Sequence, residues 1–119
     1  TRKYDKEITE KYNIKFGGGR KRIKKVIIKS STNSEKKYMA EFKDETGKIV
    51  KTTHFGANGM SDYTKHKDPK RKQRYINRHK KNENWDDFTS AGSLSRYILW
   101  GEPTLRESIK SYKKRFRLI

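Results

Sequence analysis

Alternating apolar and polar residues in the first half of the chain predict a small β-sheet. Every second residue from Tyr38 to Phe42 is apolar within Lys36–Asp44, a period of two that is typical of a half-buried strand. The turn sequence DETGK joins this segment to residues 48–55, which are rich in β-branched side chains, so the two predict a hairpin. A β-branched cluster within residues 22–30 predicts a third strand. A three-stranded antiparallel sheet of this size needs a cover on its apolar face.

Two helix patterns in the second half of the chain supply part of that cover. Asp68 followed by Pro69 combines an N-cap with a proline at the first helical position, which predicts a helix over residues 69–80. Residues 91–100, AGSLSRYILW, predict a second helix that follows a capping threonine or serine and ends at Gly101. Its expected inner face carries Ala91, Leu94, Ile98 and Leu99. The connection between the sheet and the first helix is polar and glycine-rich, so we expect a loop there.

A third helix has the clearest amphipathic pattern in the chain. Thr104 and Glu107 form a capping box, and apolar residues then recur at three- and four-residue spacing as far as Phe116. Strands therefore come first along the chain and helices second. That order predicts an α+β fold, with a three-stranded antiparallel sheet followed by about three helices.

The first 19 residues differ from the rest and form a predicted arm. The spacing of Tyr4, Ile8 and Tyr12 fits a narrow apolar stripe on a short helix, and it fits an extended arm about equally well. Three consecutive glycines follow. We interpret them as a hinge rather than a phosphate-binding turn, because no Walker-type lysine with serine or threonine comes after them. The predicted organisation is an arm and hinge over residues 1–19 and a single small basic domain over residues 20–119.

Positive charge is the feature of the composition that bears most on function. The 119 residues include 32 Lys and Arg against 14 Asp and Glu, a formal charge of +18, and only 29% are hydrophobic. The excess is even, because residues 1–60 and residues 61–119 each hold 16 basic and 7 acidic residues. Such a charge destabilises a compact monomer by self-repulsion. We therefore expect a nucleic acid, an acidic protein surface or an anionic membrane to neutralise it.

Residue types and apolar segments that the sequence lacks exclude several classes of protein. The chain has no cysteine, which excludes disulfides and thiolate metal sites. It has no apolar run near the roughly 20 residues of a membrane span, and its N-terminus lacks the apolar core of a signal peptide. We expect a protein that is soluble or peripheral to a larger assembly.

The segment KHKDPKRKQRYINRHKK, residues 65–81, has the densest positive charge and is the predicted binding site. It holds nine Lys and Arg and one acidic residue. On a helix, many of its basic residues share one face, while Tyr75 and Ile76 anchor the helix to the rest of the domain. A solvated surface is the alternative, but acids at compensating spacing are almost absent, so counterion release favours an anionic partner. The expected contacts are Lys65, Lys67, Lys70, Arg71, Arg74, Arg78 and Lys81, joined by Arg20, Lys21 and Arg22 after the glycines.

Aromatic residues are interleaved with this charge. Stacking on nucleic-acid bases is one use for them, but a chain poor in leucine and valine needs them in its core. We therefore predict that Trp85, Phe88, Trp100 and Phe116 are buried. No RNP-type strand, helix-turn-helix or zinc-finger pattern is visible, so sequence-specific recognition has no support.

Three histidines raise the question of catalysis. His54, His66 and His79, with Asp62 and Asp68 nearby, superficially resemble the elements of a metal-dependent nuclease. Their spacing matches no signature that we recognise, and basic residues near them oppose cation binding. We expect structural histidines, and a protein without enzymatic activity, metal, cofactor or small-molecule substrate.

Two long segments carry a likeness to known proteins. They are KTTHFGANGMSDYTKHKDPKRKQRYINRHKKNENW and AGSLSRYILWGEPTLRESIKSYKKRF, and the HFG turn, the SDYT segment and the LW…PTL junction are the most similar parts. On these, residues 38–116 resemble a small basic domain of large nucleocytoplasmic DNA viruses, including chlorovirus- and mimivirus-like lineages. That family has no established activity. The resemblance implies a virus-encoded protein located in the virion.

Two functions fit these observations. The first is a non-enzymatic structural protein of the virion, a minor capsid, cement or scaffold component that docks its basic surface on capsid or other virion proteins, or on an internal membrane. The arm and hinge favour it, because arms that order on assembly bridge neighbouring proteins. The alternative is a non-specific DNA-binding protein that condenses the viral genome, which the net charge and residues 65–81 favour.

Overall fold

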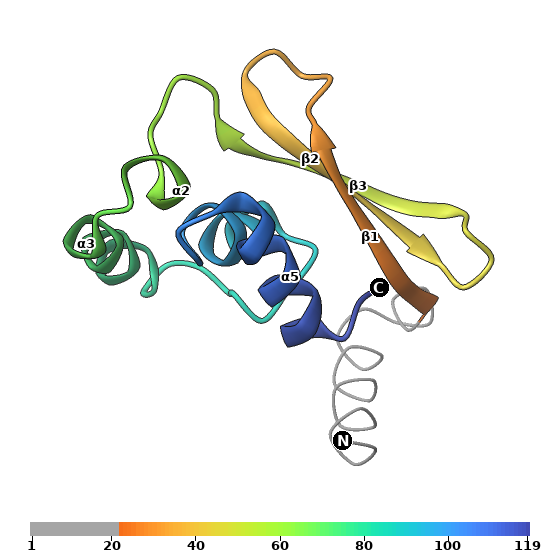
Figure 1. Cartoon of the computed structure of the whole chain (residues 1–119). Coiled ribbons are helices and arrows are strands. Elements are labelled where there is room, and N and C mark those ends of the chain that lie inside the picture. Colours follow the sequence, from red (N-terminus) through yellow and green to blue (C-terminus); the bar gives the residue numbers. More distant parts are fainter. Residues whose placement is uncertain (1–21) are drawn as a thin grey trace.

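A computed structural model of the protein describes residues 22–119 (Figure 1). The predicted arm and hinge, and the predicted contacts Arg20 and Lys21, lie outside these residues. The elements follow in the order β1 (Ile23–Ser30), β2 (Lys36–Asp44), β3 (Ile49–Ala57), α2 (Tyr63–His66), α3 (Pro69–His79), α4 (Ala91–Leu94), η2 (Ser95–Leu99) and α5 (Leu105–Phe116). The predicted α+β fold, an antiparallel three-stranded sheet followed by helices, is confirmed.

The sheet gathers its large apolar side chains through the register of its strands. Its order is β1-β2-β3, with both pairs antiparallel. Phe42 of β2 lies opposite Val26 of β1, and Tyr38 of β2 lies opposite Phe55 of β3. Since side chains alternate between the two faces of a strand, these residues point to one side. The helices cover this side.

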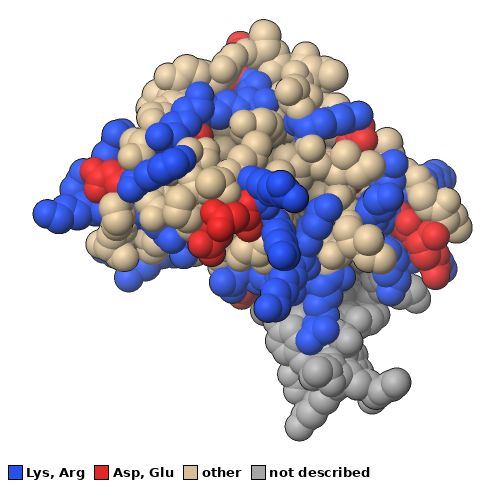
Figure 2. All heavy atoms as spheres, viewed as in Figure 1, with Lys and Arg blue, Asp and Glu red and all other residues tan. Residues whose placement is uncertain are grey.

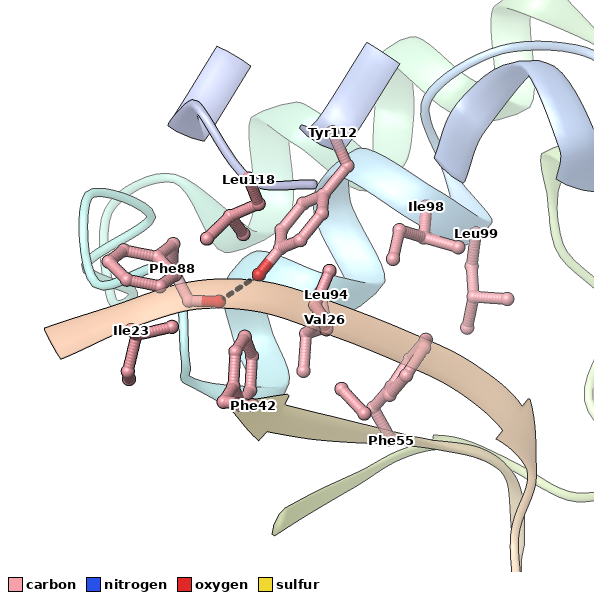
Figure 3. Close-up of a cluster of buried hydrophobic side chains, with 11 residues drawn as sticks. Ile23, Val26, Phe42, Phe55, Phe88, Leu94, Ile98, Leu99, Tyr112 and Leu118 are labelled. Atoms are coloured by element: carbon pink, nitrogen blue, oxygen red, sulfur yellow. Dashed lines mark hydrogen bonds between the residues drawn. The ribbon is translucent and has the colours of Figure 1, made fainter. Parts of the chain in front are cut away.

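Helices α4, η2 and α5 lie on the apolar face of the sheet, and α3 lies beyond them on the side away from the sheet (Figure 1). The core between these layers is drawn in Figure 3. Its Tyr112 hydroxyl donates a hydrogen bond to the carbonyl of Phe88, so the buried phenol keeps a partner. The largest apolar and aromatic side chains that are fully buried are Val26, Phe42, Phe55, Leu94, Ile98 and Tyr112.

The C-terminal residue adds a short piece of backbone to the edge of β1. The N–H of Val26 donates to the carbonyl of Ile119 at 3.2 Å, and the N–H of Ile119 donates to the carbonyl of Lys24 at 2.9 Å. Leu118 is buried just before this contact. The end of α5 is thereby tied to the first strand.

The second helix differs from its prediction in form. It begins as α4 and widens into a π-helical turn at η2, where the N–H of Trp100 donates to the carbonyl of Ser95 at 3.0 Å. Gly101 ends it as predicted, because a Cβ at that position would lie 2.2 Å from the carbonyl oxygen of Tyr97. Ala91, which was expected on the inner face, is exposed. The expected inner residues Leu94, Ile98 and Leu99 are buried.

The prediction of four buried aromatic residues is correct only for Phe88, which is 5% exposed. Trp85, Trp100 and Phe116 are half-buried. The fully enclosed aromatic positions between sheet and helices are filled by Phe42, Phe55 and Tyr112. Trp100 and Phe116 pack against the core from its margins.

A short helix, α2, replaces part of the expected loop between the sheet and α3. The carboxylate of Asp62 caps it by accepting from the N–H of Thr64 at 2.9 Å. The same carboxylate accepts from Nζ of Lys37 on β2 at 2.6 Å, and the two side chains are only 2% and 8% exposed. This buried ion pair fastens the sheet to the first helices.

None of the helices between residues 22 and 119 combines the length and the apolar character that crossing a bilayer requires.

Candidate anion-binding surface

Helix α3 presents a row of basic side chains to solvent. The helix begins at Pro69. Asp68 is its N-cap, and the side chain of Asp68 accepts a hydrogen bond from the N–H of Lys70 at 2.9 Å. We define the basic row as Lys70, Arg71, Arg74 and Arg78, all of which are exposed. Arg71 and Arg78 are seven residues apart, which is about 10 Å along an α-helix. No member of the basic row forms an ion pair with a carboxylate within residues 22–119.

Two lysines near the start of α3 hold the helix in place instead of joining the row. Lys67 was predicted to lie on the basic face, but it stands in the link before the helix with φ 55°, and its Nζ donates to the carbonyls of Thr64 and Pro103. Lys72 lies on the inner flank and donates to the carbonyl of Gly101 at 2.7 Å. Burial lowers the pKa of Lys72. Backbone carbonyls in the 101–103 turn therefore bind the ammonium groups that secure α3.

The remaining predicted contacts lie apart from the row. Lys65 is exposed on α2, and Lys81 is exposed in the turn after α3. Arg22 is exposed before β1, where its guanidinium is 3.7 Å from a carboxylate oxygen of Glu45. The structure therefore brings together four of the predicted residues on one helix, and it places the other described ones elsewhere.

The inner face of α3 is anchored by a column of rings. Tyr75 stacks on Trp100 with a centroid distance of 4.4 Å and an interplanar angle of 5°, and His79 stacks on the other side of Tyr75 at 4.3 Å. His66 continues the column at 5.3 Å from Trp100. Burial raises the pKa of the Tyr75 hydroxyl. The predicted anchoring role of Tyr75 is confirmed, since the side chain is buried.

Sequence reasoning missed this column for a specific reason. The spacing of Tyr75 and His79, one turn apart on α3, is a local signal that could have been noticed. No local signal joins them to Trp100, which follows the π-helical turn 25 residues after Tyr75. Their contact depends on how α3 packs against the helices over the sheet.

The three histidines do not converge. His54 forms a hydrogen bond of 2.7 Å with the hydroxyl of Ser31, and His79 is paired with Glu83. His66 accepts from the N–H of Asp68 at 3.0 Å. Between residues 22 and 119, no three His, Asp or Glu side chains are grouped so that they could hold a metal ion.

His66 makes the stability of the fold sensitive to mild acid. Its Nδ1 accepts from Asp68, so its proton is on Nε2, which is buried without a hydrogen-bond partner among the described residues. Burial, and then the charge of Arg71, lower its pKa below the ordinary 6.5. Between the folded and the unfolded pKa, the unfolded chain holds the extra proton. Above about pH 6.5, the protonation of His66 does not lower the free energy of unfolding. As the pH falls below this value, the unfolded chain takes up the proton first and the folded state loses stability.

We expect this loss to appear as a fall in the thermal unfolding midpoint between about pH 7.5 and pH 5.5. His66→Asn retains an acceptor for the Asp68 N–H and removes the titrating ring. The variant should show a smaller fall over the same interval, measured by circular dichroism. Parallel curves for the two proteins would exclude His66 as the source.

Basic side chains extend well beyond α3. Figure 2 shows Lys and Arg spread over α3, α5 and the sheet on the face in view, with few Asp and Glu between them. On α5 the exposed members are Arg106, Lys110, Lys114 and Arg115. Within residues 22–119, the basic row of α3 and a second set of exposed cations on α5, spaced four residues apart from Arg106 to Lys114, both lie in a broadly positive surface.

Taken together, the fold and its surface define a small, strongly basic α+β domain. Residues 26–79 match a family whose description is "Family of unknown function (DUF5754)". The matched segment extends from Val26 in β1 to the end of α3, so the chain is similar to this family over the sheet and the basic row. No curated protein and no solved structure matches the chain.

Proposed function

We propose that this protein is a non-enzymatic nucleic-acid-binding protein that contacts phosphate groups through the basic row of α3. The observation that carries the proposal is the row itself, four exposed cations without a carboxylate partner in the described part of the chain. Three of the four are arginines, whose planar guanidinium groups bind phosphate oxygens through two parallel hydrogen bonds.

The energetics of the free helix support a partner for this row. Like charges three or four residues apart on a helix destabilise it by about 0.2–0.5 kcal/mol per pair. The pairs Lys70–Arg74, Arg71–Arg74 and Arg74–Arg78 have this spacing. A polyanion removes the repulsion, and each phosphate that is neutralised releases condensed counterions into solution. The row therefore lowers the stability of the free protein and favours binding.

The position of α3 also suits contact with an extended partner. The helix lies farthest from the sheet (Figure 1), and the ring column and two lysines keep its inner side attached to the domain. Contacts from its outer side to phosphates carry no sequence information. Binding should accordingly depend on charge and strand geometry, and only weakly on base sequence.

A second candidate function is supported by the breadth of the basic surface. Cations on α5 and on the sheet lie outside the row and would remain unneutralised if α3 alone met a partner. A minor capsid, cement or scaffold protein, surrounded by acidic faces of capsid proteins or by an internal membrane, would use them all. The resemblance to viral domains supplies the setting, a place in the virion. In this case nucleic acid would be at most a secondary partner.

Binding of a random-sequence DNA duplex across a salt series separates the two functions. For nucleic-acid binding, we expect the logarithm of the association constant to fall steeply with the logarithm of salt concentration, with a slope that corresponds to about six or more neutralised phosphates. Binding should still be measurable near physiological salt. A shallow slope, with binding lost at modest salt, would contradict the proposal and favour docking on a protein or membrane surface.

A further inference from the structure

A cavity lies beside the end of the basic row. It has a volume of about 650 Å³. It lies between the open end of the β2–β3 hairpin, where β2 begins and β3 ends, the C-terminal end of α3 and the start of α4. Arg78, the last member of the basic row, is one of its lining residues. Cavities of this size are typical of sites for small organic ligands.

One wall of the cavity is apolar. It is formed by Phe55 from β3, Leu99 from η2 and Trp100 after it, with Tyr75 of α3 beside them. Met60 also lines the cavity and is 65% exposed, which makes it a flexible apolar side chain at the opening. This wall suits a flat, largely apolar group.

Three polar side chains among the lining residues offer hydrogen-bonding atoms that have no partner within residues 22–119. Asn84 uses its Oδ1 to accept from the N–H of Asp86, and its amide NH₂ remains free to donate. Asp87 uses Oδ1 for Thr89, and its second carboxylate oxygen remains free to accept. The hydroxyl of Ser95 is also without a partner in this part of the chain. Together they supply a donor and acceptors, the kinds of group that pair with the edge of a nucleobase.

The charged residues that line the cavity fall into two groups. Two ion pairs are internally balanced, Lys37 with Asp62 and His79 with Glu83. The exposed cations Lys36 and Arg78 have no carboxylate partner among the described residues. A ligand that fits this arrangement has a neutral body with N–H donors, which enters the cavity, and an anionic group that stays at the opening.

We propose that this cavity binds one nucleotide, with the nucleobase inside and its phosphate at Arg78 and Lys36. The proposal rests on the proposed function and extends it from contacts with the phosphate backbone to capture of a single unpaired base. The two cations at the opening repel a lysine or arginine side chain, and the free oxygen of Asp87 repels an acidic one. An unpaired nucleotide of a strand enters without the cost of breaking a base pair.

Abasic DNA provides the decisive comparison, because it has the same phosphates and lacks the bases. We expect the protein to bind a mixed-sequence single strand about tenfold more tightly than an abasic strand of equal length at the same salt concentration, since enclosing one base has an effect of this order. Fluorescence anisotropy of end-labelled strands measures both affinities. A free mononucleotide, titrated separately, tests whether the base must be part of a strand.

Two asparagines offer a matched pair of variants. Asn84→Asp keeps the oxygen that accepts from Asp86 and replaces the free amide donor in the cavity by an anion. Asn82→Asp makes the same charge change two residues away, at an exposed position outside the cavity. We expect Asn84→Asp to abolish the preference for the base-containing strand and Asn82→Asp to retain it. If Asn84→Asp does not fold, Ala91→Phe fills the opening from an exposed lining position and should give the same loss.

The outcomes distinguish the cavity from the surface. Equal binding of both strands, with no mononucleotide binding, would overturn the cavity proposal while the proposed function stands. Failure to bind either strand would overturn the proposed function. Mononucleotide binding that Asn84→Asp removes, without any difference between the strands, would support the cavity and identify a free nucleotide as its ligand.

Discussion

Replacing Arg71, Arg74 and Arg78 together with glutamine should weaken binding to a DNA duplex by about 100-fold near physiological salt, because three phosphate contacts and the associated counterion release are lost. The logarithm of the association constant, plotted against the logarithm of salt concentration, has a negative slope. The magnitude of this slope should decrease by about three, since each lost phosphate contact reduces it by close to one. Affinity and slope are both obtained from fluorescence anisotropy over a salt series. A loss of affinity with an unchanged slope would not fit removal of phosphate contacts.

Helix α5 offers the matched control for this experiment. Arg106, Lys110 and Lys114 are also exposed, and replacing them with glutamine removes the same three charges from another surface. We expect this control to weaken binding by less than about tenfold, through the general field alone. Equal losses in the two triple variants would mean that binding depends on net charge and that the basic row has no special role.

The same row variant should be at least as stable as the natural protein. Glutamine is nearly as good a helix former as arginine, and the substitutions remove three repulsive pairs from α3. A small rise in the thermal midpoint together with the large fall in affinity would show that the row exists for binding. A marked fall in the midpoint would instead assign these side chains a structural role.

Asp62→Ala should destabilise the fold by about 3–5 kcal/mol, the largest effect that we expect from a single polar substitution. It leaves the ammonium of Lys37 without its partner in a site where the lysine side chain is 8% exposed. It also removes the cap of α2. Chemical denaturation, with an unchanged dependence of the unfolding free energy on denaturant, measures the loss.

Two further variants isolate the cause of that effect. Lys37→Met in the Asp62→Ala background removes the stranded charge and should recover much of the stability, because apolar replacement of a buried ion pair is often close to neutral. Glu41→Ala breaks the pair with Lys29, whose side chain is 49% exposed, and should cost less than about 1 kcal/mol. Equal costs for Asp62→Ala and Glu41→Ala would contradict a special role for the buried pair.

The helices and strands that could be predicted from sequence are those marked by a pattern of neighbouring residues, such as an alternation of apolar side chains or a capping residue. The alternation from Tyr38 to Phe42 locates β2, and Asp68 with Pro69 locates the start of α3, where the cap hydrogen bond is observed. Thr104 accepts from the N–H of Glu107 at 3.1 Å, as the capping box requires. The exposed basic row follows from the same helical spacing.

Patterns of neighbouring residues could not predict which aromatic side chains are buried, or which lysines bind carbonyl groups of the protein itself. Phe88 and Trp85 stand three residues apart, and nothing local indicates that one is enclosed and the other half-exposed. Lys67 and Lys72 belong to the same charged segment as Arg71, but carbonyls from the 101–103 turn bind their ammonium groups. These outcomes depend on which distant segment packs against each side chain.

The sequence by itself determined the order of strands and helices, their caps and the positive face of α3, because hydrogen-bonding caps and side-chain periodicity act over a few neighbouring residues. Only the tertiary structure decided the ring column on Tyr75, the buried pair of Lys37 and Asp62, and the cavity beside Arg78. Each of these joins residues about 25 or more positions apart. Such contacts form when packed layers meet, and the geometry of those layers is set by the whole core and by no single segment.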